Sequence, residues 1–367
     1  MSSALDVAQL VIGIAVLYWG SEWLVRGSAA LARGFGVRPI VVGFVVVAYA
    51  NSAPELAVAT KTALAHSQPI ALGTVIGSCA ANIALVLGLG ALIAPPTIDG
   101  RIIRREVPIL VGSALIVPLL LRNGILSQLE GLLLVGCALL FTVVTLVISA
   151  RQGPGQAATD PAESIPGSAA GSSHDVMMTA EAEAEADQAE AEAEADQADA
   201  TTRADASGAR LGGRGRPRAR PGVAILMSLG GVGLLLFGAA WLVAGGRAFA
   251  AQIGMSERML GLTIIALGTS LPELIGSINA AARGNASRAV GSVIGSNLLN
   301  VFLVLGVTAY LRPIDLGERM HVVDLVGLVA ITLLGVIMLR GSRRISRFEG
   351  GVLVASYIGF IVAAALL

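Results

Sequence analysis

Long apolar runs, separated by short polar stretches, occupy most of this chain. We distinguish about ten hydrophobic segments, with approximate bounds 6–32, 39–66, 69–94, 106–121, 126–150, 222–249, 257–283, 287–310, 321–339 and 349–366. A helix needs about 20 apolar residues to cross a bilayer, and most of these runs have that length. The pattern therefore predicts an all-α polytopic membrane protein with about ten transmembrane helices.

One stretch, residues 151–221, breaks the pattern. It is rich in Ala, Gly, Pro, Asp, Glu and Arg and repeats "AEAEAEADQ" in tandem at 180–188 and 189–197. Such a composition cannot bury enough apolar surface to fold. We predict a disordered linker between a first transmembrane repeat at 1–150 and a second at 222–367, with five helices each. A regulatory or cation-sensing role for the linker is the alternative.

The two halves are copies of each other at a constant offset of 218 residues. This offset relates Trp23 to Trp241, Pro54 to Pro272, Glu55 to Glu273, Gly77 to Gly295, Ser78 to Ser296 and Asn82 to Asn300. With five helices per copy, the second copy must enter the membrane from the opposite side. Inverted repeats are a transporter architecture, in which the substrate site lies near the bilayer midplane between the halves.

Composition agrees with this reading, since 14% of the residues are charged against about a quarter in soluble domains. Basic residues near helix ends favour the cytoplasm, and they cluster after the first, third, fifth, seventh and ninth segments. Clear examples are Arg26, Arg33, Arg104, Arg105, Arg151, Arg283, Arg340 and Arg347. We therefore predict a multi-pass cell-membrane protein with both termini outside and the linker in the cytoplasm.

The candidate chemistry lies in two matching motifs, "NSAPEL" at 51–56 and "TSLPEL" at 269–274. A Glu at the bilayer centre costs at least a few kcal/mol on insertion scales. Proline removes one hydrogen bond from a helix interior and loosens the carbonyls before it, and such carbonyls are tolerated at membrane depth where they line a cavity. Each motif therefore offers a hydroxyl, loose carbonyls and a carboxylate within one turn.

Four polar stripes at helical spacing accompany the two glutamates. They comprise Ser52, Glu55 and Thr62; Thr74, Ser78 and Asn82; Ser270, Glu273 and Ser277; and Ser292, Ser296 and Asn300. Interhelical packing is an alternative explanation of the hydroxyls and amides, but it leaves the carboxylates unexplained. If the stripes face one centre they form an oxygen cage, which suits a hard cation such as Ca²⁺.

At the level of these motifs the chain resembles the sodium/calcium exchangers of the cation/calcium exchanger superfamily, as a bacterial member. The resemblance rests on "GFVVVAYANSAPELAVATKTAL" with "GTVIGSCAANIALVLG", and on "GLTIIALGTSLPELIGSINAA" with "GSVIGSNLLNVFLVLG". It implies ten helices in two inverted halves, electrogenic or proton-coupled antiport of Ca²⁺, and a sliding gate formed by the long first and sixth helices.

The resemblance also implies roles for individual residues. Glu55 and Glu273 would bind Ca²⁺ and the counter-ion in turn, four hydroxyls would serve flanking Na⁺ sites, two amides would complete the cage, and two carbonyls would contribute beside the prolines. The hydroxyls are those of Ser52, Ser78, Ser270 and Ser296, the amides are those of Asn82 and Asn300, and the carbonyls are those near Asn51 and Thr269. The chain departs from the family pattern at Ala50–Asn51, where Gly–Thr is usual, at Cys79, and at Asn300, where some relatives have Asp.

These observations predict a secondary antiporter that exchanges Ca²⁺ for Na⁺ by alternating access. Coupling to H⁺ or K⁺ is the alternative, and a passive cation channel is a less favoured one. An enzyme is not expected, because no nucleophile–base pair, His cluster or phosphate loop accompanies the carboxylates. The expected partners are small inorganic cations and the lipid bilayer, with no nucleic acid and no cofactor, and a monomer is expected.

Overall fold

The computed structural model describes residues 3–35, 46, 48–96, 100–151, 221–282, 286–315, 322–341 and 344–366. The predicted disordered linker lies almost entirely outside these residues, so that prediction and the domain bounds derived from it stay predictions. Within the described residues, eight helices are long and apolar enough to cross a membrane, and a bent pair makes a ninth. Those nine match nine of the ten predicted segments, and the remaining one, 39–66, is only partly described.

The first half contains one long helix, a group of shorter ones and two further long helices. Its elements are α1 (Ser3–Gly34), α3 (Ala48–Asn51), α4 (Ala53–Leu64), α5 (Gln68–Ala80), the π-helical turn η2 (Ala81–Val86), α6 (Leu87–Ile93), α7 (Gly100–Leu120), the 3₁₀ turn η3 (Leu121–Asn123), β1 (Ile125–Leu126) and α8 (Gln128–Arg151).

The second half has the same plan. Its elements are α10 (Pro221–Ile253), α11 (Glu257–Leu260), the π-helical turn η5 (Gly261–Ile265), α12 (Ala266–Thr269), α13 (Leu271–Ala282), α14 (Ala286–Leu299), the π-helical turn η6 (Asn300–Leu305), α15 (Gly306–Leu311), β2 (Ile314–Asp315), α16 (Val322–Gly341) and α17 (Arg347–Leu366). The two short strands pair antiparallel, with Ile125 opposite Asp315.

The duplication read from the sequence recurs in the helix bounds. Adding 218 to the bounds of α3 and α4 gives the bounds of α12 and α13 without a residue of difference. The two copies therefore share local structure as well as motifs. Their opposite orientation in a membrane stays a prediction.

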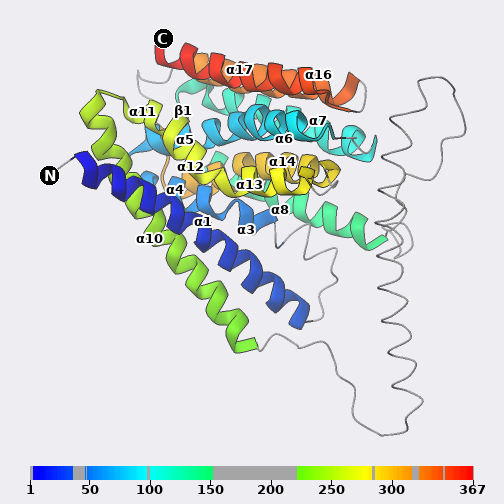
Figure 1. The fold of residues 1–367 in the computed structure, drawn as a ribbon, viewed down its shortest axis with the longest axis horizontal. Coiled ribbons are helices and arrows are strands. Elements are labelled where there is room, and N and C mark those ends of the chain that lie inside the picture. The colour runs from blue at the N-terminus through cyan, green and yellow to red at the C-terminus, as the bar shows by residue number, and fades with distance from the viewer. Residues whose placement is uncertain are drawn as a thin grey trace, which may run out of the picture. The chain divides into compact units, whose positions relative to one another are not determined.

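The two long helices, α1 and α10, pack against each other along their length and cross the side of the bundle at a slant (Figure 1). Buried glycines recur every seven residues in both, at 13, 20 and 27 and at 231, 238 and 245. Each lies against the partner's backbone: a Cβ on Gly13 would stand 2.4 Å from the nitrogen of Leu242, and one on Gly231 would stand 2.6 Å from that of Leu24. The pairing is antiparallel, and glycine permits the close approach.

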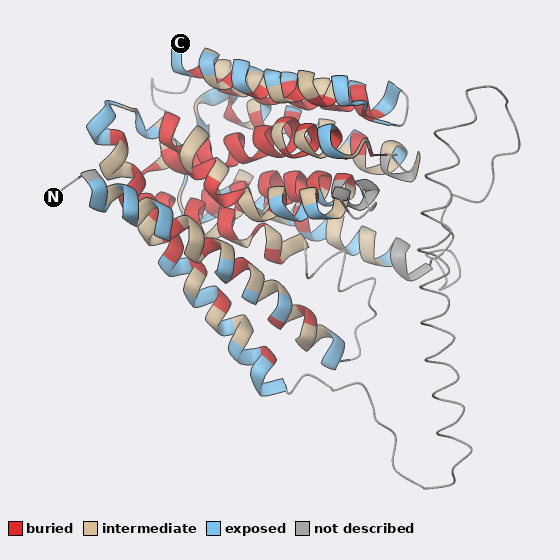
Figure 2. Cartoon of the chain, viewed as in Figure 1, coloured by how far each residue is buried: buried red, intermediate tan, exposed pale blue. Residues whose placement is uncertain are grey.

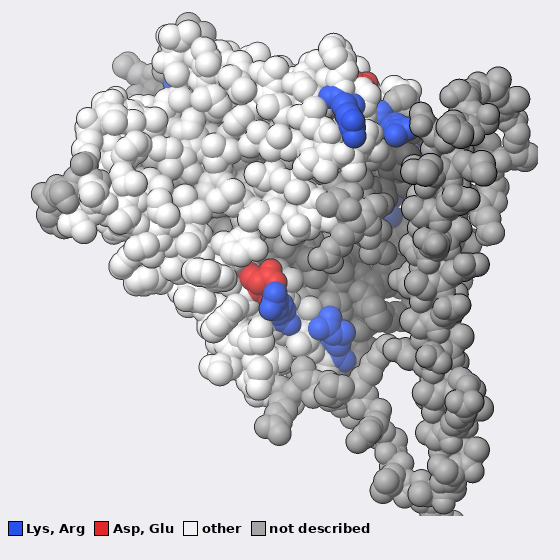
Figure 3. Space-filling view, in the orientation of Figure 1, with Lys and Arg blue, Asp and Glu red and all other residues white. Residues whose placement is uncertain are grey.

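Burial separates a central group of helices from an outer one (Figure 2). We compare the buried share of the most apolar 18-residue window in each span. It is 94% for the window in Gln68–Ile93 and 72% for that in Val290–Leu311, against 17% for that in Gln128–Val147. The exposed residues of α8, α10 and α16 are largely apolar, and Figure 3 shows a face with few charged side chains. The helices around α5 and α14 thus form the protein interior, while the outer helices present the apolar surface that lipid requires.

A few polar contacts fix the ends of the helices. Ser127 with Glu130, and Ser346 with Glu349, form reciprocal capping boxes that start α8 and α17. Near the start of α11, Arg258 forms an ion pair with the buried Asp324 of α16 at 2.7 Å and donates to the carbonyl of Ala364 in α17. That contact ties the bent helix of the second half to its outer helices.

Candidate cation-binding site

Each S-x-P-E motif breaks its helix at the serine. Ser52, between α3 and α4, has φ −79° and ψ 3°, and Ser270, between α12 and α13, has φ −84° and ψ 2°. The segments before and after Ser270 diverge by 44°. Pro54 and Pro272 have no N–H for the carbonyls of Ala50 and Gly268, four residues earlier. The break predicted from the prolines is therefore present in both copies, and Glu55 and Glu273 lie in the first turn of the helix that follows.

The amides of Asn82 and Asn300 lie in π-helical turns, which the sequence pattern did not reveal. Asn82 is the second residue of η2 and Asn300 is the first of η6. π-Helices occur mostly as single turns inside α-helices, and such turns are frequent at functional sites. The helix breaks at Ser52 and Ser270 and the π-helical turns η2 and η6 thus place one irregularity on each of the four segments that carry the polar stripes.

Polar contacts connect the two copies at this point. The hydroxyl of Ser270 donates to Oε1 of Glu55 at 3.5 Å. The hydroxyls of Ser78 and Thr269 lie 3.3 Å apart, and Ser78 also donates to the carbonyl of Ala266 at 3.4 Å. Packing agrees, because α4 contacts α5 and η6, while α13 contacts α14 and η2. Side chains 188 to 215 residues apart in sequence thus meet in the middle of the bundle.

The predicted cage residues are buried, and many of their atoms have no hydrogen-bond partner. Glu55 and Asn82 are completely buried and Glu273 is 5% exposed. Among the described residues, six side-chain oxygens of the cage are buried without a partner, namely Ser52 Oγ, Glu55 Oε2, Asn82 Oδ1, both carboxylate oxygens of Glu273 and Asn300 Oδ1. Each unsatisfied buried polar group costs about 1–3 kcal/mol. The six oxygens match the donor type and number that Ca²⁺ takes from proteins.

Among the residues that the structure describes, the carboxylates also have no cationic partner. No Lys or Arg of the described residues pairs with Glu55 or Glu273, and the two negative charges repel each other. A buried charge persists when it is paired or coordinates a metal ion. The site therefore has the electrostatics of a receptor for positive charge.

The structure places the remaining predicted ligands with some differences. Ser78 on α5, Ser296 on α14, and Thr269 and Ser270 around the break between α12 and α13 are buried, and of these Ser270 contacts Glu55, while Asn51 is only partly buried at the end of α3. Three members of the stripes serve other contacts or face outward, and one of them is Thr62, whose hydroxyl donates to the carbonyl of Val58 in its own helix. Ser292 is exposed, and the hydroxyl of Thr74 donates to the carbonyl of Ile70 in its own helix. A helical stripe is longer than the depth of one site, so its outer members serve other contacts.

One buried amide was missed. Asn297 is 2% exposed, and its Oδ1 has no partner among the described residues. Asn297 belongs to the Gly-Ser-Asn triplet at 295–297, whose counterpart in the first half has Cys79 in place of the asparagine. It was not among the site residues predicted from the sequence. Its burial and position next to Ser296 are the signals that distinguish it.

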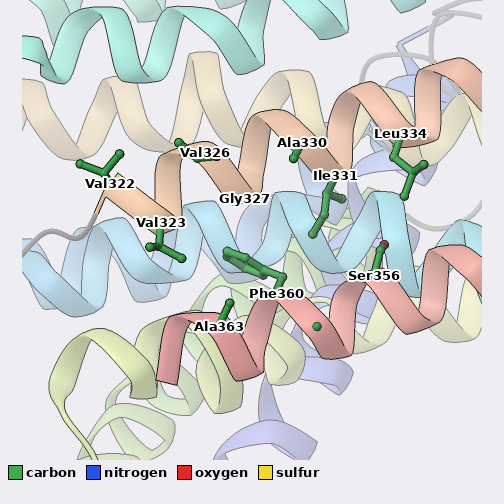
Figure 4. Close-up of a pocket in the computed structure, with 11 residues that line it drawn as sticks. Val322, Val323, Val326, Gly327, Ala330, Ile331, Leu334, Ser356, Phe360 and Ala363 are labelled. Atoms are coloured by element: carbon green, nitrogen blue, oxygen red, sulfur yellow. The ribbon is translucent and has the colours of Figure 1, made fainter. Parts of the chain in front are cut away.

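A separate open groove lies between α16 and α17, lined by residues such as Val326, Ile331 and Phe360 (Figure 4). Its lining is almost wholly apolar, and the hydroxyl of Ser356 there donates to the carbonyl of Leu353. Such a surface has no donor set for a cation.

Known proteins with this architecture share most of the chain's length. A family profile described as sodium/calcium exchanger protein matches residues 5–147 and 223–366. A putative antiporter, CaxA, of Alkalimonas amylolytica is 30% identical over 96% of both chains. The sodium/calcium exchanger MaX1 of Methanosarcina acetivorans is 28% identical over 96% of both chains.

The fold has solved counterparts as well. A structure of the sodium-calcium exchanger NCX_Mj superposes with a TM-score of 0.60 at 25% identity, covering 98% of each chain. The inner membrane protein YrbG of Escherichia coli, 29% identical over 99% of this chain and 97% of its own, places a relative in a membrane. The family profile covers both halves and stops at the central stretch. The chain is therefore a membrane protein that belongs to the sodium/calcium exchanger family of cation antiporters.

Proposed function

We propose that this antiporter exchanges Ca²⁺ for Na⁺ at the cage formed by Glu55, Glu273 and their neighbours. The carrying observation is the set of six buried oxygens without partners, which includes three carboxylate oxygens and lies among four irregular helices. A dehydrated cation satisfies such oxygens collectively, whereas water or a neutral solute leaves the −2 charge uncompensated. The names of the relatives, which include a sodium/calcium exchanger, support this choice of ions.

Charge balance supplies the coupling. One Ca²⁺ neutralises two ionised carboxylates, as do two Na⁺ ions or two protons, while a cage that is empty and ionised keeps two buried negative charges. Because a buried uncompensated charge is costly, the empty site resists sealing and the loaded site does not. The protein then changes its exposed side only when it carries a cation, which makes the flux an exchange and not a leak.

We assign the gate to the paired helices α1 and α10. They pack together through six glycines, and they contact the broken helices α4 and α12. Displacing the pair would open or cover the cage without disturbing the buried α5 and α14. In this proposal both termini lie outside, the central stretch is cytoplasmic and one chain suffices for transport.

The counter-ion is tested in proteoliposomes in which the Na⁺, K⁺ and H⁺ gradients are varied one at a time. We expect an outward Na⁺ gradient alone to drive uptake of radioactive calcium, with K⁺ and pH gradients of the same size giving the level of protein-free vesicles. Uptake driven by a pH gradient without Na⁺ assigns H⁺ coupling instead. Calcium flux that is independent of every counter-ion gradient identifies a channel and overturns the proposal.

A further inference from the structure

Asn297 and Cys79 make a reciprocal contact that the transport proposal does not use. The amide nitrogen of Asn297 donates to the carbonyl of Cys79 at 3.1 Å, and the thiol of Cys79 donates to the carbonyl of Asn297 at 3.9 Å. Both residues are 2% exposed. The contact connects α5 with α14, the two central helices that carry Ser78 and Ser296 and lead into the π-helical turns of Asn82 and Asn300.

The two partners are equivalent positions of the internal repeat, since 297 and 79 differ by the repeat offset of 218. A residue that touches its own repeat equivalent lies on the axis relating the two copies. The contact is therefore at the crossing point of α5 and α14. Ser78 and Ser296, which precede these residues, are both placed by that crossing.

The pair is an amide and a thiol where a symmetric pair would have two amides. The amide of Asn297 cannot turn over, because Oδ1 would then meet the carbonyl oxygen of Cys79, and two acceptors repel. Its Oδ1 thus points away from this bond and has no partner. Of the two bonds, the one from the amide is the stronger, since a thiol is a weak donor.

We propose that Asn297 is a positioning residue for the cation cage, with Cys79 as its partner. The amide holds α5 and α14 at a fixed crossing, so that Ser78 and Asn82 of one copy keep their spacing from Ser296 and Asn300 of the other. This role rests on the proposed function of the cage, but the contact itself is testable without it. Because spacing among ligands sets affinity more than turnover, we expect Asn297 to govern the concentration of Ca²⁺ that half-saturates transport.

The test exchanges the two side chains. In purified protein and in proteoliposomes, we expect Asn297→Cys and Asn297→Ala to raise the half-saturating Ca²⁺ concentration by about tenfold, the equivalent of one lost buried hydrogen bond, with a maximal rate close to that of the wild type. The double variant Cys79→Asn/Asn297→Cys re-creates the contact in mirror order across the axis. It should recover most of the wild-type affinity, which a packing defect would not do.

Thr332→Val serves as the matched control, because the equally buried hydroxyl of Thr332 bonds the carbonyl of Leu328 in its own helix. It should leave the Ca²⁺ dependence unchanged. The single variant Cys79→Asn, which supplies a second amide donor, should raise the melting temperature, and this readout remains if Asn297→Cys does not fold.

Wild-type affinity in Asn297→Ala, a double variant no better than Asn297→Cys, or a lower melting temperature in Cys79→Asn would each overturn the positioning role. Failure of the wild type itself to transport Ca²⁺ would instead refute the proposed function, and the melting temperatures would still report on the contact.

Discussion

Replacing either cage glutamate with glutamine should abolish calcium transport. Glu55→Gln and Glu273→Gln keep the shape of the side chain, and each removes one of the two negative charges of the buried site. The cation loses a direct charge-assisted ligand, worth about 3 kcal/mol, or roughly a hundredfold in affinity. Uptake of radioactive calcium into vesicles driven by an outward Na⁺ gradient should therefore fall to the level of protein-free vesicles.

The loss must come from the site and not from the fold. Glu22→Gln is the control, because Glu22 lies on the membrane helix α1 and pairs with Arg26 on the surface, where such pairs contribute little. It should transport normally. The cage variants should also purify as folded protein, since a buried neutral amide costs less than a buried carboxylate. Normal transport by either one would remove the central residues from the proposed site.

Adding a side chain to one of the six buried glycines between α1 and α10 should impair both stability and transport. In Gly13→Leu the first added carbon would meet the nitrogen of Leu242 at 2.4 Å, which no rotamer change can relieve because the neighbour is backbone. Overpacking of this kind costs about 1–3 kcal/mol. We expect a lower melting temperature in detergent and a maximal exchange rate reduced by about tenfold, with the two helices forced apart.

Gly233→Leu is the matched control, since Gly233 lies on α10, is exposed and has no heavy atom within 4 Å of an added Cβ. That variant should keep the wild-type stability and rate. If Gly13→Leu matched the wild type in both measurements, the close packing of α1 on α10 would have no part in transport, and the gate would have to be sought elsewhere.

The pattern of the sequence predicted the architecture because membrane helices are specified by simple quantities. Segment length, charge density and a constant 218-residue offset need no knowledge of packing, and the helix bounds of α3, α4, α12 and α13 follow that offset. The same holds for the breaks at Ser52 and Ser270, since proline acts on its own helix.

Features that depend on contacts between helices were not predictable in this way. The π turns at Asn82 and Asn300 have no signature in composition, and helical spacing wrongly grouped the exposed Ser292 with the buried Ser296. The glycines that recur every seven residues in α1 and α10 could be recognised as a helix contact only once the partner helix was known. Asn297 was overlooked because its significance comes from touching Cys79, which only the three-dimensional fold brings near.

The central claim is that one buried pair of carboxylates binds Ca²⁺ and Na⁺ in turn. Calorimetric titration of purified protein with Ca²⁺ at a series of Na⁺ concentrations tests it directly. We expect binding of one Ca²⁺ whose apparent affinity falls steadily as Na⁺ rises, and no binding heat in Glu55→Gln/Glu273→Gln. Binding that persists in the double variant, or Ca²⁺ affinity that is independent of Na⁺, would contradict a shared site.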